Sequence, residues 1–509
     1  MVSGTEGGGM SLKWMPRGVA FLVGAASLVQ EVLWVRLAGF ATGGLPETFA
    51  MILALYLLGI AIGAQLGRRL CVGRVLDIRR RASLVLLLSA LVDIAAPFLF
   101  SWGIGFLPVT VAMLPLVIAT AALKSALFPV VHHLGSNDAV AWKGGSFSKV
   151  YFANVAGCTL GPLIVTLWLM DVMAMEQLFV GVATVTALAG MWLAGLRLLA
   201  VPSVVVAIAA LVLQPALPAL ASRIVMATGG GAQAAWLLER KEGIIHTIAD
   251  PQGDIVFGGN VYDGRINVDL RLNSNKIDRV YAAMAAVPNP KRVLVIGLSG
   301  GSWTRVIASF PTVERVDVVE IHPGYLELIA GHPQVAPILQ DPRVHIHIDD
   351  GRRWLRAQEG ARYDAVVVNS TFHWRSGVTM LLSQEFFRLI GAHLSDSGVA
   401  LVNATGSPEV LKTAASEFPQ AYLFGNSVIM SRRDFRDTLR AGGEAIYATR
   451  MNGRPVFDPA NASDVAAVRK VTAADLVGID VMEERAGRPV EVNTDLRMLT
   501  EYKYGASSR

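Results

Sequence analysis

Residues 291–301 read KRVLVIGLSGG, and this stretch decides the fold of the second half of the chain. Val293–Ile296 is a short aliphatic run, typical of a buried parallel strand. Gly297, Ser299 and Gly301 follow at the turn, where small residues let the backbone pass close to a ligand and the next helix points its N-terminus at that ligand. The pattern predicts a Rossmann-like nucleotide-binding domain.

Three further predicted strands each end in polar side chains. The second ends in Glu320, whose carboxylate can accept hydrogen bonds from both hydroxyls of a ribose. The third, Val344–Ile348, is followed by Asp349 and Asp350, where a carboxylate can meet the amine of adenine, and the fourth runs into Asn369. Polar strand ends along one edge mark the usual ligand site of such a sheet, although Glu320 and Asp350 could instead be helix caps. We expect the nucleotide to be bound by Gly297, Ser299, Gly301, Glu320, Asp349, Asp350, Gly351 and Asn267.

The first half of the chain has the composition of a membrane protein. Hydrophobic residues make up 53% of the 509 residues and charged residues 17%, against roughly 25% charged in soluble domains, and the excess lies before about residue 221. We expect four segments: a polytopic helical domain at 1–221, a small β-rich entry region at 222–290, a Rossmann-like catalytic domain at 291–430, and C-terminal helices with a closing segment at 431–509.

A bilayer-spanning helix needs about 20 apolar residues, and seven stretches come near this length: 17–40, 48–66, 82–103, 106–131, 150–170, 176–196 and 201–221. The arginine-rich loop at 68–81 predicts a cytoplasmic loop and a cytoplasmic N-terminus. From a cytoplasmic N-terminus, seven crossings would place the nucleotide domain outside the cell, where its nucleotide is absent. The stretch 201–221 contains three prolines and is the weakest, so we expect an even number of crossings in the inner membrane, six or eight, with the nucleotide domain in the cytoplasm.

The predicted helices carry polar residues and a glycine repeat. Gly59, Gly63 and Gly67 recur every four residues, which predicts close helix packing inside the chain, with a homodimer as the alternative. Gln30, Glu31 and Arg36 lie in the first apolar stretch, where ionisable groups usually have a partner or face a cavity. We expect Glu31 and Arg36 to pair with each other or to lie in the interface, with a substrate pathway as the alternative, and either Lys124 or Asp93 could be a buried partner for Glu31.

The charge distribution and the cysteine content argue against a nucleic-acid-binding protein and against a metal site. The net charge of +5 comes with arginines in short loops between apolar stretches, which indicates membrane topology rather than nucleic-acid binding. Cys71 and Cys158 are the only cysteines, and His345 and His347 have no carboxylate or cysteine at metal spacing. We predict no nucleic-acid partner and no metal.

The strand-end residues, in this order, resemble the spermidine synthase family of polyamine aminopropyltransferases, and more closely its bacterial branch fused behind a hydrophobic domain. The resemblance covers about 236–430. QEVLWVR at 30–36 and SFSKVYFANVAGCTLGP at 146–162 resemble the membrane half, and VYDGRIN at 261–267 resembles the β-structured entry. It implies transfer of an aminopropyl group from decarboxylated S-adenosylmethionine to an amine, leaving methylthioadenosine.

Four positions depart from the family pattern. The family's loop aspartate corresponds to Gly300, its catalytic aspartate to Asn369, a further aspartate to Phe372, and its bordering glutamine to Asn267. An amide cannot act as a general base at neutral pH, so Asn369 can only orient a substrate. A carboxylate in the loop would repel the carboxylate of intact S-adenosylmethionine, so its absence favours intact S-adenosylmethionine as the ligand. We expect Arg305 or Arg265 to meet the ligand's carboxylate.

The catalytic candidates lie around the fourth strand end and the entry region. His373 directly follows that strand end, and its ordinary pKa is near neutrality, so it is the first candidate base, with substrate positioning or a structural role as alternatives. Tyr262, Asp263 and Asp269 are second choices. Trp374 and Phe372 could stack on adenine or pack in the core, while Asp495 and Glu501 resemble the family's closing segment.

Four functions stay open at this point. The leading hypothesis is a transferase that passes an alkyl group from S-adenosylmethionine to a lipid or small-molecule acceptor at the bilayer. The others are an intramolecular lyase or cyclase that releases methylthioadenosine, an ordinary spermidine-forming aminopropyltransferase, and a nucleotide-gated transporter or sensor.

Overall fold

The computed structural model describes residues 7–135, 145–195, 219–370 and 372–505. The chain divides into two compact units, Met1–Ala234 with Glu239–Lys241, and Ala235–Leu238 with Glu242–Arg509. The first is helical and the second is an α/β unit with a Rossmann-like sheet, so the predicted fold class is confirmed.

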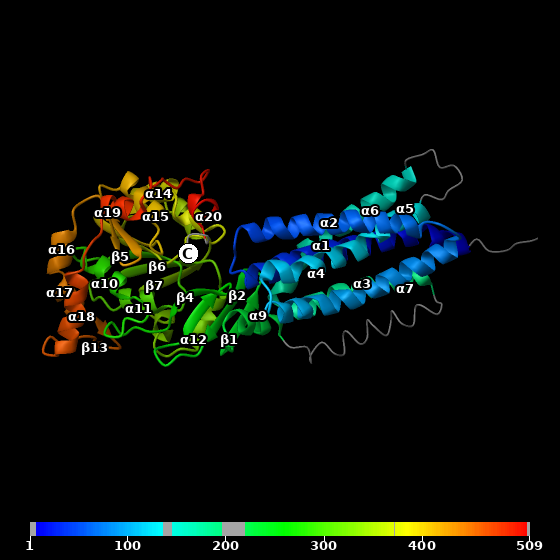
Figure 1. Ribbon diagram of the computed structural model, residues 1–509. Coiled ribbons are helices and arrows are strands. Elements are labelled where there is room, and N and C mark those ends of the chain that lie inside the picture. Colours follow the sequence, from blue (N-terminus) through cyan, green and yellow to red (C-terminus); the bar gives the residue numbers. More distant parts are fainter. Residues whose placement is uncertain (1–6, 136–144, 196–218, 371, 506–509) are drawn as a thin grey trace, which may run out of the picture. The chain divides into compact units, whose positions relative to one another are not determined.

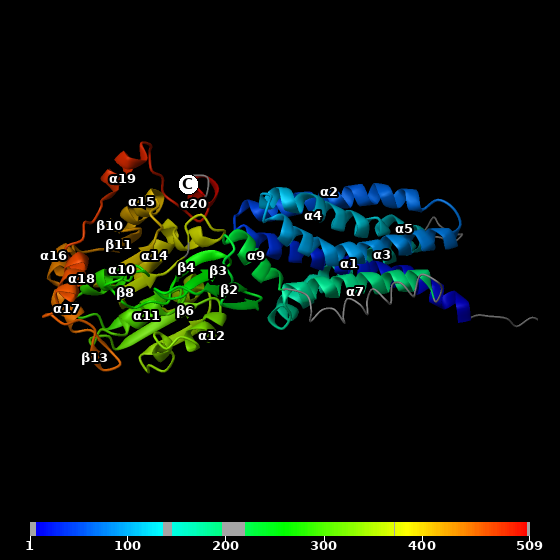
Figure 2. The ribbon, with the colours of Figure 1, turned by 60° about the horizontal axis from the view of Figure 1, so that its bottom comes forward.

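The helical unit is a bundle of long apolar helices, which lie side by side in Figures 1 and 2. Its helices are α1 (Gly7–Ala41), α2 (Glu47–Leu70), α3 (Val75–Gly103), α4 (Val109–Ser125), α5 (Leu127–Gly135), α6 (Gly145–Leu167), α7 (Met175–Ala194) and α9 (Leu220–Thr228). Six described spans, with α4 and α5 counted together, are long and apolar enough to cross a membrane. They coincide with the first six predicted stretches, and the seventh, 201–221, lies almost wholly outside the described residues.

The glycine repeat of α2 packs inside the bundle. A Cβ added at Gly63 would lie 2.3 Å from the carbonyl oxygen of Ala122, and one at Gly67 would lie 2.2 Å from that of Ala126. Only glycine allows α2 to approach the backbone of α4 and its junction with α5 this closely. The predicted internal packing is therefore confirmed.

Asp93, Lys124 and Gln30 form a buried polar network between α1, α3 and α4. The Lys124 Nζ lies 2.5 Å from Asp93 Oδ1, and both side chains are fully buried. Gln30 donates to the same carboxylate oxygen at 2.7 Å and accepts from Lys124 at 2.5 Å. The expectation that Lys124 or Asp93 pairs with Glu31 is wrong, because Lys124 and Asp93 pair with each other.

Arg36, at the other end of the polar stretch of α1, donates a hydrogen bond to the backbone carbonyl of Arg240.

The second unit contains two main sheets. The entry sheet has the order β1-β2-β3-β4 and the large sheet the order β10-β11-β9-β8-β5-β6-β7. The entry strands are β1 (Trp236–Arg240), β2 (Gly243–Ile248), β3 (Ile255–Gly258) and β4 (Val261–Arg265). The large sheet consists of β5 (Arg292–Ile296), β6 (Arg315–Glu320), β7 (Val344–Ile348), β8 (Tyr363–Val368), β9 (Leu394–Asn403), β10 (Gln420–Phe424) and β11 (Ser427–Ser431). Strands β5 to β9 run parallel, and β11 and β10 close one edge as an antiparallel pair.

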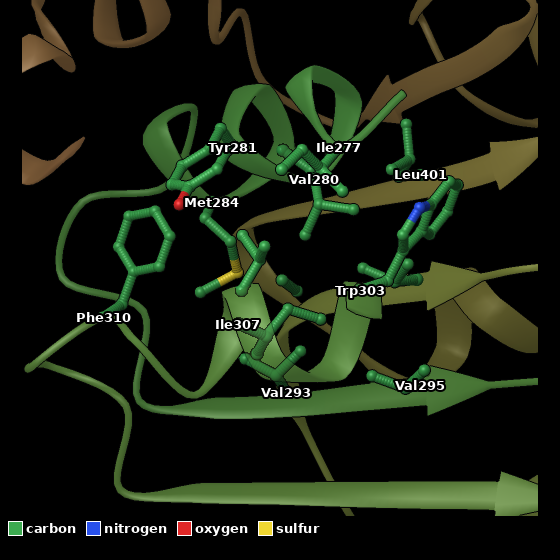
Figure 3. Close-up of a cluster of buried hydrophobic side chains, with 14 of the residues drawn as sticks. Ile277, Val280, Tyr281, Met284, Val293, Val295, Trp303, Ile307, Phe310 and Leu401 are labelled. Carbon is green, nitrogen blue, oxygen red and sulfur yellow. The ribbon is translucent and has the colours of Figure 1, made fainter. Parts of the chain in front are cut away.

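Helices cover both faces of the large sheet. They are α10 (Asp278–Ala285), α11 (Ser302–Ile307), α12 (Gly324–Ala330), α13 (Gly351–Ala357), α14 (Gln384–His393) and α15 (Pro408–Glu417). Along β5 the side chains alternate between two cores, because successive residues of a strand point to opposite faces. Val293 and Val295 belong to the core under α10 and α11, which Figure 3 shows, and Leu294 and Ile296 to the core under α13 to α15.

The C-terminal segment adds short elements around the sheet. These are α16 (Arg436–Ala441), α17 (Gly443–Tyr447), β12 (Arg450–Met451), β13 (Arg454–Pro455), α18 (Ala462–Thr472), α19 (Ile479–Ala486) and α20 (Leu499–Tyr502). Asp495 forms an ion pair with Arg352 of α13 at 2.6 Å, and Glu501 accepts a hydrogen bond from the backbone of Thr379 at 2.9 Å. The closing segment thus holds the turn that carries Leu381, a residue of the site described below.

Candidate functional site

The predicted strand ends meet at one edge of the sheet. Ile296 at the end of β5 pairs with Val319 of β6 and with Val368 of β8, and Glu320 pairs with Ile348 of β7. The loops after these strands therefore emerge side by side, as the sequence predicts. This arrangement is the usual ligand position in a Rossmann-like sheet.

The glycine loop after β5 needs its small residues. Gly297 and Gly301 have φ of +92° and +78°, and Ser299 lies in the left-handed region at +49°. A Cβ at Gly297 would lie 2.6 Å from the backbone oxygen of Asn369. The loop thus crosses the end of β8 at a distance that only glycine permits.

Glu320 is held by the glycine loop and by its own turn. Its side chain is buried, and its two oxygens accept hydrogen bonds from the backbone N–H of Leu298 at 2.7 Å and of His322 at 2.8 Å. Burial raises the pKa of Glu320 to about 7, and the nearby Asp263 adds to the rise. Each carboxylate oxygen can accept a further hydrogen bond, so Glu320 can still bind the two hydroxyls of a ribose.

Two adjoining cavities open at this edge. The large cavity, of about 250 Å³, is lined by Glu320, Asp350, Gly351, Gly297 and their neighbours. The small cavity, of about 110 Å³, is lined by Tyr262, Lys276, Arg279, Gly300, Asn403, Thr405 and others. Asp263, Ser299 and Asn369 line both cavities. The larger one, with Glu320 and Asp350, has the polar groups that a nucleoside needs, and the shared residues mark the junction.

Asp263 is the carboxylate at this junction. It is placed by β4, and its Oδ2 accepts a hydrogen bond of 2.5 Å from the hydroxyl of the buried Tyr325 in α12. Burial raises the pKa of Asp263, while the hydrogen bonds from Tyr325 and Ser299 and the charge of Arg375 oppose the rise. A partly buried carboxylate with a raised pKa at a cavity is suited to proton transfer.

Asp350 and Asp349 take different positions after β7. Asp350 is exposed on the wall of the large cavity, and it also caps α13, since its Oδ1 accepts from the backbone N–H of Arg353 at 2.7 Å. Asp349 forms an ion pair with the side chain of Arg353 at 2.5 Å and lines neither cavity. The helix-cap alternative therefore describes part of the role of Asp350, and its place on the cavity wall keeps the adenine prediction open.

His373 and Asn267 line neither cavity. The His373 Nδ1 is 2.6 Å from the hydroxyl of Thr405, which lines the small cavity, but His373 itself lines neither. The Asn267 amide donates to the carbonyl of Gln252 at 2.7 Å, and its oxygen accepts from the backbone of Asp269. Tyr262, by contrast, is 40% exposed and lines the small cavity.

Arg305 and Arg265, the two arginines predicted to meet a substrate carboxylate, bind other groups of the protein. Arg305 donates to Asn452 at 2.6 Å, and Arg265 forms an ion pair with Asp250. Neither lines the large or the small cavity.

Basic residues that carry no sequence motif line the cavities instead. They are Lys276 and Arg279 in the small cavity and Arg375 in the large one. No local pattern marks them, because their positions depend on how α10 and the loop after β8 pack. Phe372 also lines the small cavity, and its ring lies 5.7 Å from that of Trp374.

His347 of β7 contacts two other side chains of the second unit. His347 lies 3.2 Å from Asp317 and its ring is 4.8 Å from that of Trp354. In the part of the chain that the structure describes, no three His, Cys, Asp or Glu side chains gather as metal ligands do.

Residues 280–422 match the spermine/spermidine synthase domain family. This part of the chain is a spermine/spermidine synthase domain. A polyamine aminopropyltransferase of Alkaliphilus oremlandii is 37% identical over 134 residues, which cover 26% of this chain and 46% of that one. A spermidine synthase of Solanum lycopersicum is 30% identical over 164 residues, covering 31% and 48%. The chain thus spans about half the length of these relatives, and the matched part lies in the unit that carries the synthase domain.

Solved structures of similar fold include the spermidine synthase of Thermotoga maritima, at 18% identity and a TM-score of 0.36 over 41% of this chain and 77% of that one. A spermidine synthase in complex with the transition-state analogue AdoDATO aligns at 16% identity, with a TM-score of 0.40, over 50% and 90%. In the synthase domain, Glu320 ends β6, the neighbour of β5 and its glycine loop, and Asp350 follows β7, the next strand of the sheet.

Proposed function

We propose that the second unit binds an adenosyl sulfonium nucleoside in the large cavity and transfers an alkyl group other than methyl from it. The observation that carries the proposal is the junction of the cavities, where Asp263, Ser299 and Asn369 line both. A nucleoside in the large cavity would direct its sulfonium substituent past these residues into the small one. The family match of residues 280–422 supports the same reaction class.

The binding roles follow from the strand ends. Glu320 would accept both ribose hydroxyls with the lone pairs that its backbone contacts leave. Asp350 would accept the adenine amine at the exposed wall of the large cavity. Ile296, Ile321 and Leu381 supply apolar lining for the base.

In the proposed transfer step, the nucleophile of the acceptor attacks the methylene carbon next to the sulfonium sulfur. The new bond forms as the carbon–sulfur bond breaks, and its electron pair stays on sulfur, so the donor leaves as methylthioadenosine. The acceptor must lose one proton. Asn369 cannot take it, and His373 lines neither cavity. We assign this proton to Asp263, whose carboxylate lies at the junction and has a raised pKa.

The acceptor is proposed to arrive at a bilayer. The same chain carries six helices long and apolar enough to cross a membrane. Joining such a bundle to a transferase favours a lipid or amphiphilic acceptor, because both substrates then meet at one surface. We propose an inner-membrane location with the nucleotide-binding unit in the cytoplasm, where the donor is made.

A second candidate is an intramolecular reaction. The residue after β8 is Asn369, so that strand end supplies no base for an incoming amine. If the carboxylate of intact S-adenosylmethionine attacked its own γ-carbon, the carbon–sulfur bond would break, and the products would be a lactone and methylthioadenosine. No external acceptor or proton acceptor is needed for this step.

The test uses the full-length protein in detergent, incubated with S-adenosylmethionine with and without bacterial membrane lipid. Mass spectrometry would follow methylthioadenosine and any alkylated lipid. The transferase proposal predicts that lipid increases methylthioadenosine formation and that an alkylated product appears with it. Methylthioadenosine formed equally without lipid, together with a lactone, would replace the transferase with the intramolecular reaction.

A further inference from the structure

The small cavity has an unusual balance of charge for an enzyme that handles amines. Its charged lining residues are Lys276, Arg279 and Asp263. The rest of its polar lining is neutral, with Asn275, Ser299, Ser302, Asn369, Ser370, Asn403, Thr405 and Asn426. Two cations against one carboxylate repel an incoming ammonium group and attract an anion.

Arg279 is a buried cation without a carboxylate partner. Its side chain is 7% exposed, donates to the hydroxyl of Ser427 at 3.0 Å, and lies over the ring of Trp303 at 5.7 Å. No ion pair with Arg279 occurs among the described residues. Burial lowers the pKa of Arg279, and the charge of Asp278 opposes this only in part. Burying an unpaired charge is costly, so an anionic ligand at this wall would supply the missing counter-ion.

Lys276 adds a second positive charge at the mouth of the cavity. It precedes α10 with a φ of +53°, a backbone conformation uncommon for a residue other than glycine or asparagine. The residue is exposed, and the described part of the chain gives its ammonium group no ion pair. Its charge is therefore available to a ligand.

A side chain in place of Gly300 in the glycine loop would be tightly packed at the same wall. Gly300 lines the small cavity, and a Cβ there would lie 3.0 Å from Ile266 Cγ1 and 3.2 Å from Val256 Cγ2. An aspartate at this position would need both side chains to move. Gly300 thus contributes no acidic group to this wall, and Asp263 is the one carboxylate among the residues that line the small cavity.

We infer that the small cavity binds the carboxylate of intact S-adenosylmethionine through Arg279 and Lys276. The inference rests on the proposed function, because it requires the nucleoside to occupy the large cavity. A decarboxylated donor would bring an ammonium group, without a compensating carboxylate, towards two cations. The group transferred is then aminocarboxypropyl: the acceptor gains this chain and loses one proton, and the sulfur keeps the electron pair of the broken bond.

The test is calorimetric titration of the full-length protein in detergent with three ligands: S-adenosylmethionine, decarboxylated S-adenosylmethionine and methylthioadenosine. Methylthioadenosine has neither the ammonium nor the carboxylate, so it reports on the large cavity alone. The variants are Arg279→Gln and Lys276→Asn, and asparagine is chosen because it tolerates a positive φ. Lys291→Gln is the matched control, since Lys291 is exposed, pairs with Glu314 and lines neither cavity.

The wild-type protein is expected to bind S-adenosylmethionine more tightly than the decarboxylated donor. Arg279→Gln should weaken S-adenosylmethionine binding by roughly tenfold or more, as for a lost charge-assisted hydrogen bond. Lys276→Asn should weaken it by about two- to fivefold, as for an exposed pair. Both variants should leave methylthioadenosine binding unchanged, and the Lys291→Gln control should change nothing. An unchanged methylthioadenosine affinity also shows that each variant is folded.

Two outcomes would overturn the inference while leaving the proposed function intact. One is tighter binding of the decarboxylated donor by the wild-type protein. The other is an equal effect of both variants on the two donors, with methylthioadenosine still bound. Failure of the wild-type protein to bind any of the three ligands would instead overturn the proposed function.

Discussion

The hydroxyl of Tyr325 donates a 2.5 Å hydrogen bond to the carboxylate of Asp263. This bond joins α12 of the synthase domain to β4 of the entry sheet, and it fixes Asp263 at the junction of the large and small cavities. In the proposed reaction Asp263 would therefore be oriented before the substrates bind, as a general base requires.

Replacing Tyr325 by phenylalanine should therefore change the pH dependence of the reaction. The Tyr325 hydrogen bond lowers the pKa of Asp263, which burial raises, so its loss should raise that pKa further. Because only ionised Asp263 can accept a proton, the rate should rise with pH through this pKa. The rising limb of the pH–rate profile should move to higher pH in Tyr325→Phe. Tyr504→Phe, which removes a hydroxyl bonded to Glu491, should leave the profile in place.

Asp263→Asn should remove the proposed general base and leave nucleoside binding unchanged. Loss of a general base typically costs about 10²- to 10⁴-fold in rate, measured here as methylthioadenosine release. The dissociation constant of methylthioadenosine should stay within about twofold of the wild-type value. A variant that retains full activity would show that another group, such as His373, takes the proton.

Glu320 should make nucleoside binding depend on pH. Burial raises its pKa to about 7, so the protonated form predominates below pH 7 in the empty protein. A neutral carboxyl accepts the ribose hydroxyls poorly, so methylthioadenosine affinity should fall as the pH drops, by up to about tenfold per unit below the pKa. Glu320→Gln should bind weakly with no such slope, and the exposed Glu314→Gln should behave like wild type. A pH-independent wild-type affinity would contradict the ribose assignment.

The glycines of the helical unit offer a matched pair of substitutions. A Cβ at Gly63 would lie 2.3 Å from the Ala122 carbonyl oxygen, whereas one at Gly181 in α7 would have nothing within 4 Å. Gly63→Ala should lower the free energy of unfolding in detergent, because α2 and α4 must separate. Gly181→Ala should be neutral, or stabilising by up to about 1 kcal/mol from helix propensity. Equal effects of the two substitutions would show that the close approach of α2 and α4 does not matter for stability.

The Lys124 and Asp93 pair gives a test of the buried network. Lys124→Met leaves the Asp93 carboxylate buried without its counter-ion, which should cost about 3 to 5 kcal/mol of unfolding free energy. Adding Asp93→Asn should recover most of this loss, since both charges are then gone. Lys149→Met, at an exposed position of α6, serves as the control. A double variant as unstable as Lys124→Met alone would mean that the lysine stabilises the bundle by packing rather than by charge.

The nucleotide-binding strands could be predicted from the sequence because their signal is local. Val344–Ile348 and Tyr363–Val368 have the bounds of the observed β7 and β8, since each is a short run rich in β-branched residues that is followed by polar residues. The position of Glu320 could be predicted in the same way, because it ends β6. The carboxyl ends of parallel strands lie at the same edge of a sheet, so the loops that follow them meet there. The arrangement of the strand ends therefore follows from the amino-acid sequence alone.

Side chains that meet through tertiary packing could not be predicted. Arg305 and Arg265 lie near the glycine loop and the entry strands in sequence, yet Asn452 and Asp250 bind them. Arg279 and Tyr325 carry no motif, and only the packing of α10 and α12 brings them to the cavities. Likewise, the spacing of apolar residues in the bundle cannot tell which helices are neighbours, so the pair of Lys124 and Asp93 could not be predicted from the sequence.

The proposed reaction requires that the second unit breaks the bond between the sulfonium sulfur and the carbon chain that is transferred. Mass spectrometry of the nucleoside released when the full-length protein reacts with S-adenosylmethionine and membrane lipid measures this directly. We predict methylthioadenosine, with little formed by Asp263→Asn. Release of S-adenosylhomocysteine, which would mean methyl transfer, or no release of any nucleoside, would contradict the proposed reaction.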